Sequence, residues 1–379
     1  MPPFRSSKAI QPSPSVARLL DWYARHRRSL PWRAEPGETA DPYRVWLSEV
    51  MLQQTTVTAV IPYYERFLSL FPTVRNLAEA PDDAVMAAWA GLGYYARARN
   101  LLACARRVVE LGGEFPADLD GLRDLPGIGE YTAAAVGAIA FGLPAVPVDG
   151  NVERVMSRVW AIETPLPQSK PLIKERAAAL MEQKAARAAP SDTAQALFDL
   201  GATLCASTSP ACGLCPWQPQ CEGHRKGIAA SLPRKTPKAA RPRRHGAHFH
   251  LSDAEGRVLL RRRPAKGLLG GMAEIPGTDW RAEEWTRQDA LAQAPVTQAH
   301  WVKLGSVRHV FTHFELLLDV YGASLVTIPE GAIGQGFLCP AADLDAQALP
   351  SLMAKCLVLG QKTLKQGSPA ADYPADLLV

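Results

Sequence analysis

The sequence predicts two domains of different class, an all-α domain followed by an α+β domain. Three observations lead to this prediction. The chain has 379 residues, which is more than a single hydrophobic core usually organises. From Val16 to about Ala206, apolar residues recur at helical spacing between short Pro and Gly breaks. Beyond His248 the pattern changes to short apolar runs of strand type that are separated by glycines.

The overall composition is that of an ordinary soluble globular protein, with 47% hydrophobic and 21% charged residues. The net charge of +5 permits a polyanionic partner without requiring one. No apolar run approaches the roughly 20 residues that cross a bilayer, and the first residues lack the apolar core of a signal peptide. We therefore expect a cytoplasmic monomer with no membrane partner.

Composition also predicts the domain boundaries. Residues 1–14 carry four prolines and three serines, which indicates a flexible tail. The helical domain is expected to span residues 15–224. Residues 225–246 contain Arg and Lys among Pro and Ala with no acid, which indicates a basic interdomain linker. The second domain is expected at 247–367, before a tail at 368–379.

An isolated carboxylate stands out in the first half of the helical domain. Two segments show the helical spacing there: Val16, Leu19, Leu20 and Tyr23 share one face, and Trp46, Val50, Gln53 and Gln54 share another. Glu49 is the only acid in this second, otherwise uncharged stretch, which favours a partly buried carboxyl group with a raised pKa. A structural hydrogen-bond acceptor is the alternative interpretation of Glu49.

The pentapeptide LPGIG at 125–129 indicates a tight turn between two helices. Pro126 ends one helix, the two glycines allow the turn, and the next helix begins with free amide groups. This is the form of a helix-hairpin-helix, expected over about 119–141, whose backbone N–H groups hold a DNA phosphate. An ordinary turn whose glycines serve only geometry is the alternative.

A second carboxylate follows the turn. Asp149 precedes a helical pattern formed by Val152, Val155, Met156 and Val159, so its simplest role is a helix N-cap. A carboxylate held in this way can also face an active site. Glu49 and Asp149 together supply what cleavage of a glycosidic bond needs, one group to protonate the leaving group and one to stabilise a cationic sugar.

Four cysteines form the pattern C-x6-C-x2-C-x5-C. Thiols so densely placed in a chain without a secretory signal indicate a metal site. Only one C-x2-C pair is present, whereas structural zinc usually takes two, so the spacing favours an iron–sulfur cluster and leaves zinc as the alternative. The ligands would be Cys205, Cys212, Cys215 and Cys221.

These motifs, in this order, resemble the adenine DNA glycosylase (MutY) family, within the endonuclease III superfamily of helix-hairpin-helix glycosylases. The resemblance covers nearly the whole chain and rests on WLSEVMLQQT at 46–55, GLGYYARARN at 91–100, LPGIG at 125–129, VDGNV at 148–152 and the four cysteines. It implies a 4Fe-4S cluster and excision of adenine, mispaired with 8-oxoguanine or guanine, from double-stranded DNA after the base is flipped out.

The resemblance also implies roles for individual residues. Glu49 would protonate adenine at N7, Asp149 would stabilise the oxocarbenium-like sugar, and Tyr131 and Asn151 would position these two groups. Tyr131 stands where strand-cutting relatives carry a lysine that forms a Schiff base, so we expect a monofunctional glycosylase. The expected DNA- and base-binding residues of the helical domain are Arg28, Leu30, Trp32, Arg33, Gln54, Thr55, Tyr94, Gly127 and Gly129.

The C-terminal domain resembles the Nudix-type domain of this family, with residues 267–276 as an early strand and loop. No R-E-x-x-E-E pattern follows to hold magnesium, so we expect a reading domain without pyrophosphatase activity. Phe311, Thr312 and His313 correspond to the family's contacts with 8-oxoguanine. A strand turn with an incidental histidine is the alternative for this segment.

Two departures from the family and two rival functions remain. Residues 206–211, between the first two cysteines, contain no Lys or Arg, and Glu153 replaces what is often a lysine or neutral residue. Both departures weaken the expected attraction for phosphate. A bifunctional endonuclease III-like glycosylase would leave Tyr131 and the second domain unexplained. A non-catalytic iron–sulfur DNA-binding protein would leave Glu49 and Asp149 without a task.

Overall fold

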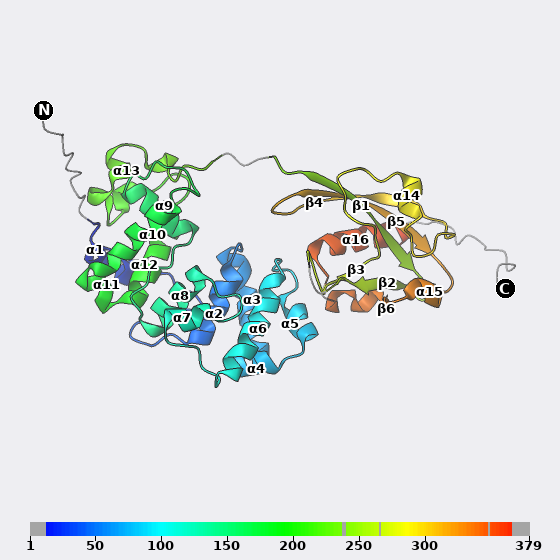
Figure 1. The fold of residues 1–379 in the computed structure, drawn as a ribbon, viewed down its shortest axis with the longest axis horizontal. Coiled ribbons are helices and arrows are strands. Elements are labelled where there is room, and N and C mark those ends of the chain that lie inside the picture. Colours follow the sequence, from blue (N-terminus) through cyan, green and yellow to red (C-terminus); the bar gives the residue numbers. More distant parts are fainter. Residues whose placement is uncertain (1–12, 237–239, 265–266, 348, 366–379) are drawn as a thin grey trace, which may run out of the picture. The chain divides into compact units, whose positions relative to one another are not determined.

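The computed structural model describes residues 13–236, 240–264, 267–347 and 349–365. The expected tail at 368–379, residues 1–12 of the N-terminal tail and residues 237–239 of the linker lie outside the described residues. The chain divides into two compact units, Met1–Ala80 with Asn100–Lys238, and Pro81–Arg99 with Ala239–Val379 (Figure 1). No helix in the described part is both long and apolar enough to cross a membrane.

The N-terminal part of the chain is all-α, as the sequence predicts. Its α-helices are α1 (Val16–His26), α2 (Pro42–Leu52), α3 (Val57–Leu70), α4 (Val74–Glu79), α5 (Asp82–Trp89), α6 (Ala96–Glu110), α7 (Leu119–Arg123), α8 (Glu130–Phe141), α9 (Gly150–Val159), α10 (Lys170–Ala178), α11 (Lys184–Ala188), α12 (Pro190–Thr203) and α13 (Glu222–Arg225). Short 3-10 turns, η1 (Ala179–Glu182), η2 (Cys212–Leu214), η3 (Gln218–Gln220) and η4 (Ala229–Ser231), lie between the later helices.

Local capping explains where several of these helices begin. Asp41 accepts hydrogen bonds from the amides at the start of α2, with Pro42 at the first helical position, and Thr56 does the same for α3. The core then joins α1, α9 and α12 through apolar side chains such as Leu19, Val155 and Leu197, all of which are buried. Packing of α2 and α12 against α8 places residues from distant segments around one site.

Helix α2 ends earlier than the sequence predicts. The expected helical face included Gln53 and Gln54, but the helix stops at Leu52 and Gln54 adopts a left-handed conformation with φ of 57°. The amide of Thr55 donates to the carbonyl of Leu52 in the resulting turn. A left-handed non-glycine residue costs about 1 to 2 kcal/mol, so tertiary structure, rather than helical propensity, sets this chain reversal before α3.

The C-terminal part has the predicted α+β class. Its strands are β1 (Arg243–Ser252), β2 (Arg257–Arg262), β3 (Ala273–Glu274), β4 (Val302–Val310), β5 (Glu315–Ser324) and β6 (Phe337–Pro340), and its helical segments are α14 (Arg287–Leu291), α15 (Glu330–Ile333), η5 (Ala341–Ala346) and α16 (Ser351–Lys365). The strand order is β3-β2-β1-β5-β4, with β6 also paired to β2. Only the β1–β5 pair is parallel among the described strands.

Alternating side chains give this sheet a hydrophobic cluster on each face. Leu316, Leu318 and Val320 of β5 join one cluster with residues of α16, whereas Tyr321 and Ala323 join the other with Phe249 and Trp301. Both faces of the sheet are therefore covered, and two histidines of the central strand β1, His248 and His250, are buried with it.

The predicted linker at 225–246 is folded at both of its ends. On one side, Arg158 donates to the carbonyl of Leu232, and Leu166 pairs with Lys235, so this part packs on the first unit. On the other side, residues 243–246 are the first residues of β1. The arginines and the histidine of these residues do not follow the apolar pattern of a strand. They form one because β5, which is distant in the sequence, pairs with them.

Candidate active site

A pocket of about 610 Å³ opens in the first unit. Residues from α2, α8, α9 and α12 line it, together with the segment after α1 and the turn between α2 and α3. It brings together ten of the residues that the sequence singled out: Arg28, Leu30, Trp32, Arg33, Glu49, Gln54, Thr55, Tyr131, Asp149 and Asn151.

Glu49 lies on the buried side of α2 and is 7% exposed. The hydroxyl of Tyr131, on α8, donates to its Oε2 at 2.6 Å. Burial and, to a smaller extent, nearby Asp149 raise the pKa of Glu49 to about 7, against the opposing effects of the bond from Tyr131 and the charge of Arg33. The expected elevation of the Glu49 pKa is therefore confirmed.

Asp149 both caps a helix and lines the pocket. Its Oδ1 accepts a hydrogen bond of 2.7 Å from the amide of Val152, which makes it the N-cap of α9. Its Oδ2 accepts a bond of 3.0 Å from the side-chain amide of Asn151. Burial raises the pKa of Asp149, and these hydrogen bonds act in the opposite direction by stabilising the ionised form.

Asp199, a residue that the sequence analysis missed, binds both arginines of the pocket. It is fully buried on α12, and its carboxylate accepts bonds from Arg28 Nε at 2.5 Å and from both terminal nitrogens of Arg33 at 2.6 and 2.7 Å. Burial alone would raise the pKa of Asp199, but the bonds from Arg33 and Arg28 outweigh it and hold that pKa below its usual value. Unlike Glu49, Asp199 shares its helix with a second acid, Asp192 in the first turn, so no isolated-acid pattern marks it in the sequence.

Arg154 joins the start of α9, at Asn151, to the first cysteine. Its guanidinium donates to the carbonyls of Cys205 and Gly201 at 2.8 and 2.7 Å, and to Asn151 Oδ1 at 2.9 Å. A side chain at Gly201 would meet Asn151 at 2.7 Å, so glycine allows this close approach. Glu153 pairs with Lys170 at 2.8 Å. Arg154 is thus directed inward, and does not compensate on the surface for the charge of Glu153.

The predicted hairpin is formed by α7, which begins at Leu119, and α8, which ends at Phe141. Gly127 has a φ of 75°, and a side chain there would lie 2.6 Å from Asn100 Cβ, so the turn requires glycine. Gly129 is the N-cap of α8 and offers no side-chain cap, which leaves the first amide groups of this helix available to an anion.

The four cysteines line one small cavity of about 20 Å³, and all four are free thiols. Arg158 is 1% exposed and donates to Cys205 Sγ at 3.4 Å and to the carbonyl of Ala206 at 2.7 Å. Among the described residues, no three His, Cys, Asp or Glu side chains form a group that could hold a metal ion. The four thiols nonetheless line one space, from Cys205 before η2 to Cys221 after η3, and the buried cation Arg158 lies against the first of them.

Comparison with known proteins places this geometry in a family. Residues 47–183 match the family model described as HhH-GPD superfamily base excision DNA repair protein, and residues 247–359 match that of the NUDIX domain. The adenine DNA glycosylase of Homo sapiens is 36% identical over 376 residues, covering 83% of this chain and 68% of that protein. The chain belongs to the adenine DNA glycosylase family.

The adenine DNA glycosylase of Mus musculus is 35% identical over 372 residues, covering 84% of this chain and 72% of that protein. Among solved structures, a thermostable thymine-DNA glycosylase is similar over 56% of this chain and 95% of its own, at 28% identity and a TM-score of 0.48. The family relationship rests on the sequence matches.

Tyr94, which the resemblance to adenine DNA glycosylases singles out, does not line the pocket. It belongs to the second unit in the division of the chain, has a φ of 49° and is 49% exposed. The guanidinium of buried Arg97 lies 5.5 Å from the centre of the Tyr94 ring and 5.3 Å from that of Trp89. The side chain is thus supported on one side while much of the ring faces solvent.

The remaining predicted residues form the turn between β4 and β5, and we call Phe311, Thr312 and His313 the recognition loop. The amide of Phe311 donates to the carbonyl of Phe314 at 2.9 Å, which closes the turn. The Phe311 ring stacks 5.8 Å from Trp280, whereas Thr312 and His313 are exposed. The aromatic base therefore fixes the loop, and its two polar side chains face outward.

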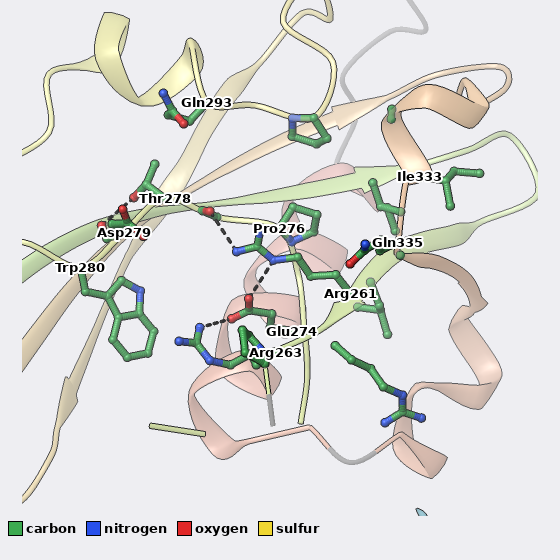
Figure 2. A pocket seen from close by; sticks show the side chains of 18 of the residues that line it. Arg261, Arg263, Glu274, Pro276, Thr278, Asp279, Trp280, Gln293, Ile333 and Gln335 are labelled. Atoms are coloured by element: carbon green, nitrogen blue, oxygen red, sulfur yellow. Dashed lines mark hydrogen bonds and ion pairs between the residues drawn. The ribbon is translucent and has the colours of Figure 1, made fainter. Parts of the chain in front are cut away.

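A larger cleft of about 1030 Å³ lies in the second unit (Figure 2). Its buried carboxylate, Glu274, is 1% exposed and accepts bonds from Arg261 at 2.8 Å and from Arg263 at 2.5 Å. The guanidinium of Arg263 also lies 4.9 Å from the Trp280 ring centre. Two arginines neutralise the one buried acid of this cleft. The smaller pocket instead contains two carboxyl groups, Glu49 and Asp149, that no arginine binds in the described structure, and we place the chemistry there.

Proposed function

We propose that this member of the adenine DNA glycosylase family removes adenine placed opposite 8-oxoguanine, and opposite guanine, and leaves an abasic site. The observation that carries this proposal is the pocket in which Glu49 and Asp149 meet. One carboxyl group holds a proton near neutral pH, and the other is held by hydrogen bonds that favour its charge. Cleavage of a glycosidic bond requires two such groups.

Glu49 acts as the general acid. With a pKa of about 7, a large fraction of Glu49 is protonated at neutral pH, when an ordinary glutamate would be ionised. The proton passes to N7 of the flipped adenine, so that the base accepts the electrons of its bond to the sugar and leaves as a neutral molecule. Tyr131, bonded to Glu49 Oε2, fixes the direction of the carboxyl group.

Asp149 stabilises the cationic sugar that remains. The main-chain amide of Val152 and the side-chain amide of Asn151 hold both of its oxygens. These two donors are neutral amides, so they hold the carboxylate in place and leave its negative charge intact. An arginine in their place would neutralise that charge. An ionised carboxylate that is held in advance by oriented donors stabilises a developing cation more than the same charge in bulk solvent does.

The flipped adenine enters the pocket and lies against a wall formed by Leu30, Trp32, Arg28 and Arg33. Trp32 is 8% exposed and offers an apolar face, whereas the arginines are immobilised by Asp199. A rigid wall lowers the cost of ordering the site when the base arrives. The hairpin turn at 125–129 and the start of α8 supply amide groups for a phosphate of the same DNA.

The absence of an amine at the centre of the pocket supports a monofunctional reaction. Tyr131 occupies the position of the Schiff-base lysine, and no lysine lines the described pocket. Borohydride should therefore trap no appreciable covalent complex between the protein and substrate DNA. Efficient trapping would instead support the bifunctional alternative.

The cysteine cavity fits a 4Fe-4S cluster in its donor chemistry, because four free thiols line one space and soft sulfur donors suit iron–sulfur clusters. When bound, the cluster would tie the end of α12 to the segments up to α13. Cys205, Cys212, Cys215 and Cys221 would hold it, and Arg158 would balance part of its negative charge. The purified protein should contain iron and labile sulfide and absorb broadly in the visible range, whereas stoichiometric zinc in anaerobic preparations would contradict this assignment.

The recognition loop would contact the 8-oxoguanine. Thr312 and His313 offer exposed polar groups on a turn fixed by Phe311, and polar loop residues on a rigid base suit the reading of a modified base edge. The specificity of the protein then lies in the second unit, while bond cleavage lies in the first.

One assay tests the function against both rivals. Duplexes that contain A opposite 8-oxoguanine, T opposite 8-oxoguanine, or an oxidised pyrimidine are incubated with the protein and scored before and after alkaline cleavage. We expect strand breaks only for A opposite 8-oxoguanine, and only after alkali. Breaks at the oxidised pyrimidine without alkali would favour the endonuclease III-like enzyme, and binding without any excision would favour a non-catalytic protein.

A further inference from the structure

The segment 241–244, which the sequence placed in a linker, lies beside the recognition loop. Its last two residues open β1, which runs parallel to β5 with Arg243 opposite Glu315. The amide of Glu315 also donates to the carbonyl of Pro242 at 3.0 Å, which extends the pairing by one residue. Because β5 begins directly after the turn, this segment and the recognition loop share one end of the sheet.

Four arginines are fixed at this end, and we call them the arginine collar: Arg241, Arg243, Arg244 and Arg308. Arg241 donates to the carbonyl of Thr312 at 3.3 Å, and the Arg244 guanidinium lies 4.5 Å from the centre of the Phe314 ring. Arg243 donates to the Glu315 carboxylate at 3.1 Å, and Arg308 donates to its other oxygen.

The collar presents its positive charge to solvent. Residues 241–244 and 308–315 contain these four arginines and a single acid, Glu315. The side chains of Arg243 and Arg308 are 69% and 70% exposed, whereas that of Glu315 is 11% exposed. The acid that holds the two arginines is therefore withdrawn from the surface, and the guanidinium groups remain on it.

The geometry leaves the most useful donors of the collar available. Arg241, Arg243 and Arg308 each make their recorded hydrogen bond through Nε. Within the described part of the chain, their terminal nitrogens have no recorded acceptor. Two terminal nitrogens in one plane form the fork with which arginine binds phosphate.

The arginines of the neighbouring cleft are used differently (Figure 2). Arg261 donates through both Nε and Nη2, to Glu274 and the carbonyl of Gly277, and Arg263 donates through Nε and Nη1, to the carbonyl of Leu268 and to Glu274. These two arginines hold the interior of the unit together. The collar, by contrast, combines fixed side chains with unused donors.

We propose that the arginine collar binds backbone phosphates of the DNA strand on either side of the nucleotide that the recognition loop contacts. This inference rests on the proposed reading role of that loop. Phosphate contacts carry affinity and set the register of the DNA but do not identify a base, so the collar supplies binding and the loop supplies discrimination. Prior fixation of the guanidinium groups reduces the ordering cost of binding.

The test uses the full-length protein with Glu49→Gln, so that the substrate stays intact. Its affinity for a duplex with A opposite 8-oxoguanine is measured by fluorescence anisotropy between about 50 and about 200 mM KCl. A variant with Arg241→Gln and Arg244→Gln leaves the Glu315 ion pairs untouched. We expect the slope of log affinity against log salt to become shallower by about two, and affinity near 150 mM KCl to fall about 30-fold.

A second variant, with Arg243→Gln, Arg308→Gln and Glu315→Gln, removes the other two arginines without leaving a buried acid unpaired. It should reduce the salt slope by a similar amount. The matched control is Arg287→Gln, an exposed arginine that donates to the carbonyl of Trp301 at 3.0 Å, at the opposite end of β4. This control should keep the parent slope, and circular dichroism melting confirms that all variants are folded.

The inference is overturned if folded collar variants keep the parent salt slope, or if Arg287→Gln lowers the slope as much. It is also overturned if the Arg241/Arg244 variant loses discrimination between 8-oxoguanine and guanine while its slope is unchanged, because the arginines would then only support the loop. A separate His313→Ala variant tests the loop itself. Undiminished discrimination in that variant would overturn the reading role of the loop, and would leave the collar, if its slope effect holds, as a lesion-independent phosphate site.

Discussion

Glu49 in the first unit and Glu315 in the second are withdrawn from solvent to the same degree, at 7% and 8% exposed, yet their pKa values move in opposite directions. Burial raises the pKa of Glu49 to about 7, and the bond from Tyr131 only partly opposes it. Hydrogen bonding from Arg308 lowers the pKa of Glu315, and Arg243 adds to this effect. A small exposed fraction therefore does not by itself set the direction of the shift: Glu49 lies in the interior of its unit, whereas Glu315 lies near the surface and is bonded by two exposed arginines.

Asp199 extends this comparison into the catalytic pocket. Its two oxygens accept four hydrogen bonds from only two residues: the backbone amide and Nε of Arg28, and both terminal nitrogens of Arg33. The guanidinium of Arg33, whose charge also acts on Glu49, is bonded to Asp199 and makes no ion pair with Glu49 among the described residues. We therefore expect the raised pKa of Glu49 to depend on Asp199.

Replacing Glu49 gives the largest expected effect. Glu49→Gln removes the proton but keeps the shape and an oxygen that accepts from Tyr131. Single-turnover excision should fall by about 10²- to 10⁴-fold, the usual contribution of a general acid, with little change in duplex affinity. The control is Glu163→Gln, an exposed acid paired with Arg234. An active Glu49→Gln enzyme would rule out the assignment of this residue as the acid.

Asp199→Asn tests whether Asp199, by binding Arg33, helps to keep the pKa of Glu49 high. Breaking a buried ion pair and leaving Arg33 without its partner should reduce the free energy of unfolding by about 3 to 5 kcal/mol, measured by urea unfolding. The released guanidinium should also lower the pKa of Glu49, so the alkaline limb of the excision rate should move to lower pH. A limb that stays in place would show that Arg33 does not reach Glu49. Glu163→Gln, which breaks an exposed pair, should cost less than about 1 kcal/mol.

Two buried histidines make the second unit sensitive to acid. Burial lowers the pKa values of His248 and His250 to about 4, whereas an unfolded histidine titrates near 6.5. As the pH falls from about 6.5 to about 4, the unfolded chain binds protons that the folded unit excludes, so each histidine removes up to about 3 kcal/mol of stability. Hydrogen exchange in β1, corrected for intrinsic rates, should report this loss.

His250→Leu should abolish the acid loss that His250 causes, because leucine binds no proton. Neither ring nitrogen of His250 has a hydrogen-bond partner among the described residues, so the change leaves no polar group unpaired there. The exposed His300, replaced by Gln, serves as the control. Equal acid sensitivity in the parent and in His250→Leu would contradict the interpretation. Glu49 has the opposite sign in the first unit: its raised pKa makes the folded state less stable as the pH rises from about 4.5 to about 7.

Tyr131→Phe gives the smallest expected effect. The tyrosine hydroxyl stabilises the ionised form of Glu49, so its removal should raise the pKa of Glu49 and shift the alkaline limb of the excision rate upward by about one pH unit. This shift is opposite in direction to that expected for Asp199→Asn. A profile of single-turnover rates between about pH 6 and about pH 9 distinguishes the two variants. If the alkaline limb moves in the same direction in both, the roles assigned here to Tyr131 and Asp199 are wrong.

Features that depend on neighbouring residues were predictable from the sequence. The hairpin turn follows from Pro126 and two glycines, and the Asp149 cap follows from the apolar pattern of α9. The raised pKa of Glu49 followed from the lack of other charges near it in the chain. For the turn and the cap, the determining groups lie within a few residues of one another, whereas the groups that set the pKa of Glu49 come from distant helices.

Features set by distant partners were not predictable. Gln54 leaves the helix because the chain must turn into α3, and the first residues of β1 form a strand because β5 lies beside them. Asp199 was missed because its two arginines lie more than 160 residues earlier in the sequence. The roles assigned to the site residues stay predictions until the variants above are measured.

The parallel pairing of β1 with β5 also has a consequence during synthesis. Arg243 pairs opposite Glu315, so 72 residues separate the partners of this ladder. At about 5 to 20 residues per second, the nascent β1 waits roughly 4 to 14 seconds for its main partner to be made. During that time the edge of β1 that will pair with β5 has no partner. The charged arginines at the start of β1 disfavour pairing of this edge with another chain. The residues proposed to hold DNA would thus protect the growing polypeptide first.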